Sequence, residues 1–136
     1  MTGQAVRDAM VPEPTALDAG ASAQEAGQRL SPPEVRAVLV CDRGKLLGVI
    51  TRKTLVREVV AAGRDPRTAT LREIAEPPLF TIEADTELED AFHTLEQRDL
   101  ERVPVVEDGR LVGILSRSVV RRRLAEDEPA PGDADL

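Results

Sequence analysis

Two short segments of this chain place a hydroxyl residue and an arginine where an anion could bind. Thr51 and Arg52 follow the aliphatic run LLGVI, and Ser116 and Arg117 follow the aliphatic run LVGIL. Each pattern predicts a strand that leads into a helix, with the hydroxyl residue as the N-cap. The free N–H groups of a first helical turn suit an anion such as phosphate, whereas an arginine there opposes the helix dipole unless an anion is near. The hydroxyl residues fit both a structural cap and a ligand contact, and the two roles can coexist.

The two segments belong to an internal repeat. The segment GKLLGVITRKTL, residues 44–55, recurs 65 residues later as GRLVGILSRSVV, residues 109–120. The same offset relates two apolar helical stripes, at positions 23, 26, 27 and 30 and at positions 88, 91, 92 and 95,. Each half predicts a β-α-β-β-α unit after a short helical turn. One unit is too small to bury its own sheet and helices, so we predict an α/β (α+β) fold of two packed repeats.

The pattern also predicts where the repeats divide and which elements they contain. The first repeat is expected over residues 1–64, the second over residues 65–125, and an acidic tail over residues 126–136. In the first repeat, Ser22 with Glu25 three residues later is typical of a helix N-terminus. The apolar runs 38–41 and 46–50 predict a hairpin. The helix after Thr51 is expected to place Leu55, Val56, Val59 and Val60 on one face.

Composition excludes several classes of function. The chain has two Phe, no Trp and no Tyr, so it offers no aromatic platform for stacking nucleic-acid bases,. The net charge of −7 disfavours DNA binding, which needs a basic face,. The tail 126–136 is acidic, contains Pro and Gly, and is expected to be disordered,. The basic run 121–123 is expected to be solvated or to form ion pairs.

The sequence carries no signature of catalysis, secretion or membrane insertion. Its single cysteine, Cys41, lies in an apolar run, which predicts a buried residue in a reducing compartment,. The N-terminus has no apolar signal-peptide core, and no apolar run approaches the length of a membrane span,. The lone His93 is expected to face solvent, and no metal cluster, catalytic triad or phosphate loop is present,. We therefore expect a soluble cytoplasmic protein that is not an enzyme.

Four features together resemble a tandem pair of cystathionine β-synthase (CBS) domains, the arrangement called a Bateman module. They are the segments 6–17, 36–55 and 101–120 and the exact repeat, and the resemblance spans residues 2–125. It implies a pseudo-two-fold pair with a cleft between two small sheets. It also implies a stand-alone regulatory module, because it leaves no room for a fused catalytic domain. The ligands that it implies contain adenosine: AMP, ADP, ATP or S-adenosylmethionine.

The family motif implies roles for individual residues. It runs through Gly, two aliphatic residues, Thr or Ser, two variable residues and Asp; the hydroxyl commonly touches phosphate and the Asp holds the ribose hydroxyls. Thr51 and Ser116 match the hydroxyl, but Thr54 and Val119 replace the Asp. A threonine can accept one ribose hydroxyl and a valine none, so we predict that the first repeat is the better site.

The resemblance also points to residues at the strands before each junction. Arg36 and Arg102 flank strands where the family often contacts ligand, and Val38 and Val103 are core residues that would also wall the pocket. Because Arg36 aligns with Glu101, the two sites are predicted to differ in charge. The predicted ligand-binding residues are Arg36, Val38, Thr51, Arg52, Thr54, Arg102, Val103, Ser116, Arg117 and Val119.

Two hypotheses follow for the function. The first is a regulatory module that binds an adenine-containing small molecule and reports it to a partner protein by a change of shape. The second is a ligand-free homodimeric interaction module, which the two missing Asp residues favour. A homodimer is predicted in either case, through the apolar stripes Leu55, Val59, Val120 and Leu124. No nucleic-acid or membrane partner is expected.

Overall fold

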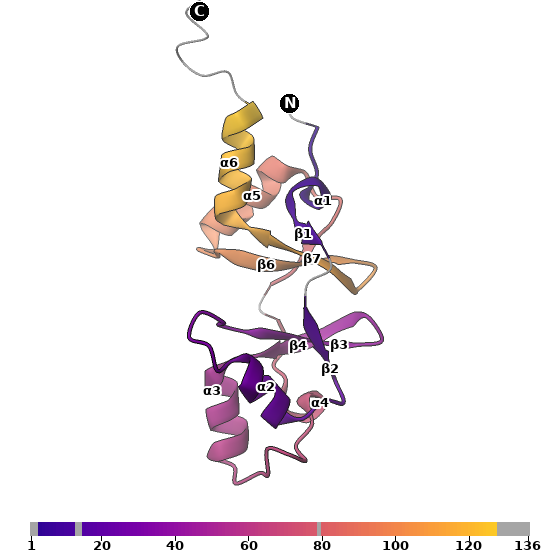
Figure 1. The fold of residues 1–136 in the computed structure, drawn as a ribbon. Coiled ribbons are helices and arrows are strands. Elements are labelled where there is room, and N and C mark those ends of the chain that lie inside the picture. The colour runs from indigo at the N-terminus through magenta and orange to yellow at the C-terminus, as the bar shows by residue number, and fades with distance from the viewer. Residues whose placement is uncertain (1–2, 13–14, 79, 128–136) are drawn as a thin grey trace, which may run out of the picture. The chain divides into compact units, whose positions relative to one another are not determined.

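The computed structural model describes residues 3–12, 15–78 and 80–127. These residues form short strands and helices in two compact units (Figure 1). Unit 1 comprises Met1–Pro14, Phe80–Asp108 and Val112–Leu136, and unit 2 comprises Thr15–Leu79 and Gly109–Leu111. In chain order the elements are α1 (Val6–Ala9), β1 (Val11–Pro12), β2 (Ala16–Asp18), α2 (Ala23–Arg29), β3 (Val38–Asp42), β4 (Lys45–Ile50), α3 (Arg52–Leu55), the π-helical turn η1 (Val56–Val60), α4 (Leu71–Ile74), β5 (Ile82–Glu83), α5 (Leu88–Gln97), β6 (Arg102–Glu107), β7 (Arg110–Ser116) and α6 (Arg117–Asp127).

The two units exchange the short helical turns that begin the repeats. Helix α1, from the first repeat, lies in unit 1 with the strands of the second repeat. Helix α4, from the second repeat, lies in unit 2 with the strands of the first repeat. Each compact unit therefore takes its helical turn from the other repeat.

Unit 2 contains the strands β2, β3 and β4. Strand β2 runs parallel to β3, and β3 forms an antiparallel hairpin with β4, as the sequence predicted. Helix α2 begins after Ser22, whose Oγ accepts the N–H of Glu25 at 3.2 Å. Cys41 is half-buried rather than fully buried. The core is aliphatic; its buried residues are Leu17, Ala19, Ala23, Ala26, Leu30, Val38, Val40, Ile50, Val59, Ala69, Leu71 and Ile74.

Unit 1 contains β5, β6 and β7, with β1 added at the edge. Strand β5 runs parallel to β6, β6 is the neighbour of β7, and β1 pairs antiparallel with β7. Helix α5 buries the stripe that the sequence predicted, with Phe92 only partly covered. The buried core residues are Val6, Ala9, Ile82, Ala84, Leu88, Ala91, Leu95, Val103, Val105, Leu115 and Val120.

The inner glycines of the repeated motif allow a second chain segment to approach the hairpin closely. A Cβ on Gly48 would lie 2.5 Å from the backbone oxygen of Glu76, and one on Gly113 would lie 2.9 Å from the backbone oxygen of Val11. Val49 pairs with Glu76, just as Ile114 pairs with Val11. The glycine in each motif therefore admits the residues that follow the exchanged helical turn.

The four aliphatic residues after Thr51 are not buried to the same extent. Val59 is buried and Leu55 is half-buried, but Val56 and Val60 are 58% and 73% exposed. The N–H of Ala61 bonds to the carbonyl of Val56, five residues back, so a wider π turn replaces an α turn,. That turn changes the angular spacing of the side chains, and the buried arc becomes too narrow for all four residues.

Helix α6 ends at Asp127, so it includes the first two residues of the predicted acidic tail. The rest of that tail, residues 128–136, lies outside the described residues. His93 is exposed, as expected. In the described part of the chain, every helix is too short or too polar to cross a bilayer.

Candidate functional site

In unit 2, the junction after β4 is closed by two threonines. Thr51 Oγ1 accepts the N–H of Thr54 at 3.2 Å, and Thr54 Oγ1 accepts the N–H of Thr51 at 3.1 Å. Their two hydroxyl oxygens lie 3.0 Å apart. This reciprocal arrangement is a capping box, and it confirms the predicted N-cap role of Thr51,.

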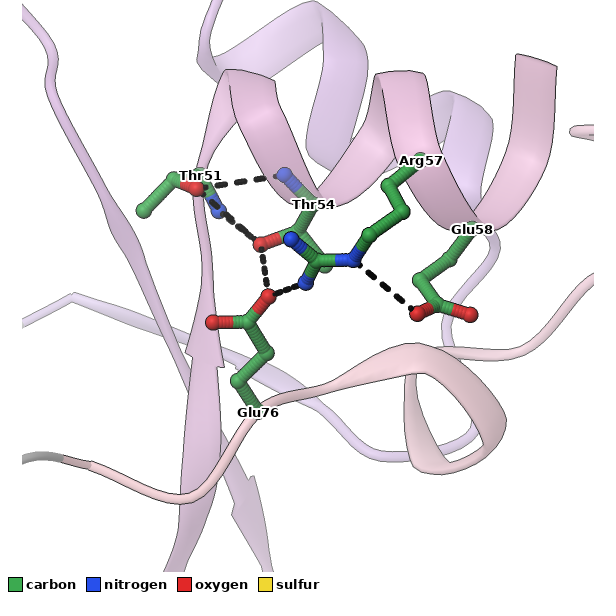
Figure 2. A network of polar contacts seen from close by, with 5 residues as sticks. All are labelled: Thr51, Thr54, Arg57, Glu58 and Glu76. Carbon is green, nitrogen blue, oxygen red and sulfur yellow. Dashed lines mark hydrogen bonds and ion pairs between the residues drawn. The ribbon is translucent and has the colours of Figure 1, made fainter. Parts of the chain in front are cut away.

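A carboxylate from outside the repeated motif completes this network (Figure 2). Thr54 is fully buried, and its hydroxyl donates to Glu76 Oε1 over 3.3 Å. Arg57 Nη2 donates to the same oxygen, while Arg57 Nε lies 3.3 Å from Glu58 Oε1. Sequence reasoning missed Glu76, which follows α4 and reaches Thr54 through the exchange of helical turns. The one hint of this contact in the sequence is Gly48, because a glycine inside a strand often marks a close approach by another backbone segment,.

The remaining predicted residues of unit 2 are Arg52, Arg36 and Val38. Arg52 Nη2 donates to the carbonyls of Leu30 at 2.5 Å and Pro32 at 2.8 Å, so it fixes the segment after α2. Arg36 is exposed and forms no ion pair with a described residue. Val38 is buried in the core.

In unit 1, the matching junction is occupied by an acidic residue of the chain itself. Glu101 Oε2 accepts the Ser116 hydroxyl at 3.2 Å and the N–H of Ser118 at 3.4 Å. Arg117 Nε lies 3.7 Å from Glu101 Oε1, and Arg117 Nη1 lies 3.4 Å from Asp99 Oδ1. The Glu101 carboxylate therefore uses donors at the start of α6 that an external anion would need.

The pKa of Glu101 reflects this environment. Desolvation raises the pKa, but the hydrogen bonds from Ser118 and Ser116 and the charge of Arg117 together lower it below its ordinary value,. The carboxylate is therefore held in its charged form. A ligand phosphate at this junction would meet a negative charge.

The other predicted residues of unit 1 supply little polar chemistry. Val103 is buried in the core, Val119 is half-buried, and Arg102 is exposed at the start of β6. Val11 takes the place that Glu76 has in unit 2, because both residues pair with the middle of the motif strand. The carboxylate and hydroxyl of unit 2 thus correspond to two valines, Val11 and Val119.

One cavity among the described residues lies away from both junctions. It is a groove of about 450 Å³ in unit 2, and none of the ten predicted ligand-binding residues lines it. Its walls come from α2, the end of α3, η1 and the segment after it, with Gly27, Leu55 and Val59 among the apolar residues. We locate the candidate ligand site by its polar groups, and interpret the groove as a surface between helices.

Comparison with known proteins identifies relatives of this chain. A family model described as CBS domain matches residues 6–61 and 71–126. Hypoxic response protein 1 of Mycobacterium tuberculosis is 32% identical over 102 residues, which cover 74% of this chain and 71% of the relative.

Two solved structures share the fold over nearly their whole length. A crystal structure of Hypoxic Response Protein I with two coordinated zinc ions has a TM-score of 0.72 and 28% identity, covering 88% of this chain and 98% of that one. The crystal structure of CBSX2 in complex with AMP has a TM-score of 0.69 and 27% identity, covering 91% of this chain and 98% of that one. These matches confirm the predicted resemblance and fold class.

Proposed function

This chain belongs to the CBS domain family, and we propose that it is a regulatory module that binds an adenine-containing small molecule and signals this to a partner protein. The observation that carries the proposal is the likeness to CBSX2, a protein crystallised with AMP, over 91% of this chain. The ligand candidates are AMP, ADP, ATP and S-adenosylmethionine. The proposed role is regulatory rather than catalytic.

The charges of the two junctions favour unit 2 as the main site. Arg36 and Arg52 are exposed there, and the side chain of Arg57 is half exposed. Arg52 uses Nη2 for two backbone carbonyls, which leaves other N–H groups of its guanidinium for a phosphate,. In unit 1, Arg117 already faces Glu101 and Asp99. We therefore assign phosphate contacts to Thr51 and Arg52, and treat Ser116 and Arg117 as a weaker site.

A homodimer remains part of the proposal, but the surface differs from the predicted stripes. Val59 and Val120 are buried inside their units, and Leu55 and Leu124 are only partly accessible. Val56 and Val60 are instead the exposed apolar residues of this helix, and Val60 lines the groove of unit 2. Sedimentation should show a dimer at micromolar concentration, and the double variant Val56→Asp/Val60→Asp should shift it toward monomer. A monomeric wild type would refute this part.

A ligand-free interaction module is the second candidate. Two observations favour it. Thr54 and Val119 both lack the carboxylate of the family motif, and Thr54 is also buried. The two candidates differ in one measurable property, which is stabilisation by nucleotide.

Thermal denaturation with each ligand candidate at millimolar concentration separates them. A ligand at one hundred times its dissociation constant stabilises the folded state by about 2.7 kcal/mol. For a chain of this size the midpoint should rise by roughly 10 °C. The variant Arg52→Ala should reduce the rise more than Arg117→Ala, each compared with its own ligand-free midpoint. No rise with any of the four compounds would favour the ligand-free module.

A further inference from the structure

We propose that Glu76 determines ligand specificity in unit 2 by accepting hydrogen bonds from a pair of neighbouring hydroxyl groups, the ribose diol of the nucleotide. The inference rests on the proposed function and deepens it. It makes Glu76, which lies outside the repeated motif and belongs to the other sequence repeat, the acceptor of hydrogen bonds from the ribose hydroxyls.

Thr54 is not available for the role that its position in the motif predicted. Its side chain is fully buried, and its oxygen already contacts the N–H of Thr51, the hydroxyl of Thr51 and the carboxylate of Glu76. A ligand could reach this hydroxyl only by opening the first turn of α3. The exposed polar group next to Thr54 is the carboxylate of Glu76, whose side chain is 41% accessible.

Glu76 is held in position from both its backbone and its side chain. Its N–H donates to the carbonyl of Val49 at 3.0 Å, and its carbonyl accepts the N–H of Val49 at 2.8 Å. Gly48 leaves room for this approach. Thr54 and Arg57 both donate to Oε1, whereas Oε2 has no hydrogen bond with a described residue. One oxygen therefore orients the carboxylate and the other is left to accept a donor from a ligand.

The charges around Glu76 favour a neutral donor over a cation. Arg57 pairs with the carboxylate, so a second cation would gain little at this position,. Hydroxyl groups can still donate to the free oxygen lone pairs, because an ionised carboxylate has about four acceptor sites. Both hydroxyls of a vicinal diol can donate to Oε2, which keeps two lone pairs, and the diol adds no charge beside the guanidinium of Arg57,. Unit 1 has Val11 in the matching place and lacks this acceptor.

The test compares two probes, AMP and 2′,3′-dideoxy-AMP, by isothermal titration calorimetry on the full chain. Wild type should bind AMP about 10- to 100-fold more tightly, which is the effect expected of hydrogen bonds to a charged group. The variant Glu76→Gln should bind the two probes within about threefold of each other, because the amide is a weaker acceptor with no charge. The matched control is Glu58→Gln, which removes the other carboxylate partner of Arg57 and should keep the wild-type preference.

The possible results separate the assignment from the proposed function. If wild type binds both probes equally, or if Glu76→Gln keeps the preference, Glu76 is not the acceptor although the nucleotide function stands. If wild type binds neither probe at millimolar concentration, the assignment of Glu76 to the diol of AMP fails, whereas the proposed function fails only if ADP, ATP and S-adenosylmethionine also give no thermal shift. The two wild-type titrations show whether the diol is recognised at all, so equal binding of the two probes overturns the assignment even if Glu76→Gln does not fold.

Discussion

The two junctions share one backbone design and differ in the groups that they present. In both units a motif strand ends at a hydroxyl residue and a helix begins, and in both an inner glycine admits a segment from the other repeat. Around this shared backbone arrangement, unit 2 has Thr54 and Glu76, and unit 1 has Glu101. The comparison shows that the glycine, the hydroxyl residue and the arginine of the motif are repeated, whereas the polar groups around them are not.

The difference in charge has a direct consequence for binding. In unit 1 the Glu101 carboxylate accepts donors at the start of α6, so the chain supplies its own anion there,. In unit 2 the corresponding residue is Arg36, which is exposed. One chain should therefore bind one nucleotide with useful affinity, in unit 2.

The largest expected effect concerns the inner glycines, Gly48 and Gly113, which both units share. Gly48→Ala should destabilise the fold by about 2–3 kcal/mol, because the new Cβ would lie 2.5 Å from the backbone oxygen of Glu76,. The melting midpoint should fall by roughly 10 °C. Gly113→Ala should cost less, because the closest atoms to its Cβ belong to the flexible side chain of Met10. Thermal denaturation of both variants measures this. Equal stability of Gly48→Ala and wild type would contradict the claim that a glycine is needed for the close approach of Glu76.

A smaller effect is expected from the buried hydroxyl that distinguishes unit 2. Thr54→Val should cost about 1–3 kcal/mol, because it leaves the N–H of Thr51 and one bond to Glu76 without a partner,. The matched variant in unit 1 is Val119→Thr, at a half-buried position, and it should change stability by less than about 0.5 kcal/mol,. Urea denaturation measures both. If the two substitutions cost the same, the network around Glu76 contributes nothing to stability.

The smallest effect concerns Glu101 and pH. Its pKa is lower in the folded chain than its ordinary value of 4.5, so its contribution to stability is present above that pH,. The contribution is lost as the pH falls through the lower, folded-state pKa. Glu101→Gln should therefore flatten this part of the curve of stability against pH, and only slightly, because the side chain is half exposed,. Denaturation curves at a series of pH values below 6 test this, and a variant curve parallel to that of wild type would contradict it.

The sequence predicted the features that depend on local chemistry and repetition. The 65-residue offset indicated two related units, and the hydroxyl residues marked the helix starts at Ser22 and Thr51. Apolar periodicity predicted the buried stripe of α5. These features could be found because each depends on residues close together in the chain or on the recurrence of one local pattern.

The features that the sequence did not reveal depend on contacts between distant segments. Glu76 meets Thr54 only because α4 packs in the unit of the other repeat. Arg52 meets the carbonyls of Leu30 and Pro32 only after the segment following α2 has folded back. The π turn that exposes Val56 likewise has no marker in its own residues. Propensity and motif spacing carry no information on such contacts.

The central claim, that unit 2 holds the nucleotide, is tested most directly by titrating isotopically labelled protein with AMP and following the backbone amide NMR signals. The account predicts that the amide signals of Thr51, Arg52 and Glu76 shift and saturate together, at one AMP per chain. The signals of Ser116 and Arg117 should move little in the same titration. Saturating shifts at Ser116 and Arg117 without shifts at Thr51 would contradict the account, and the site would then be in unit 1.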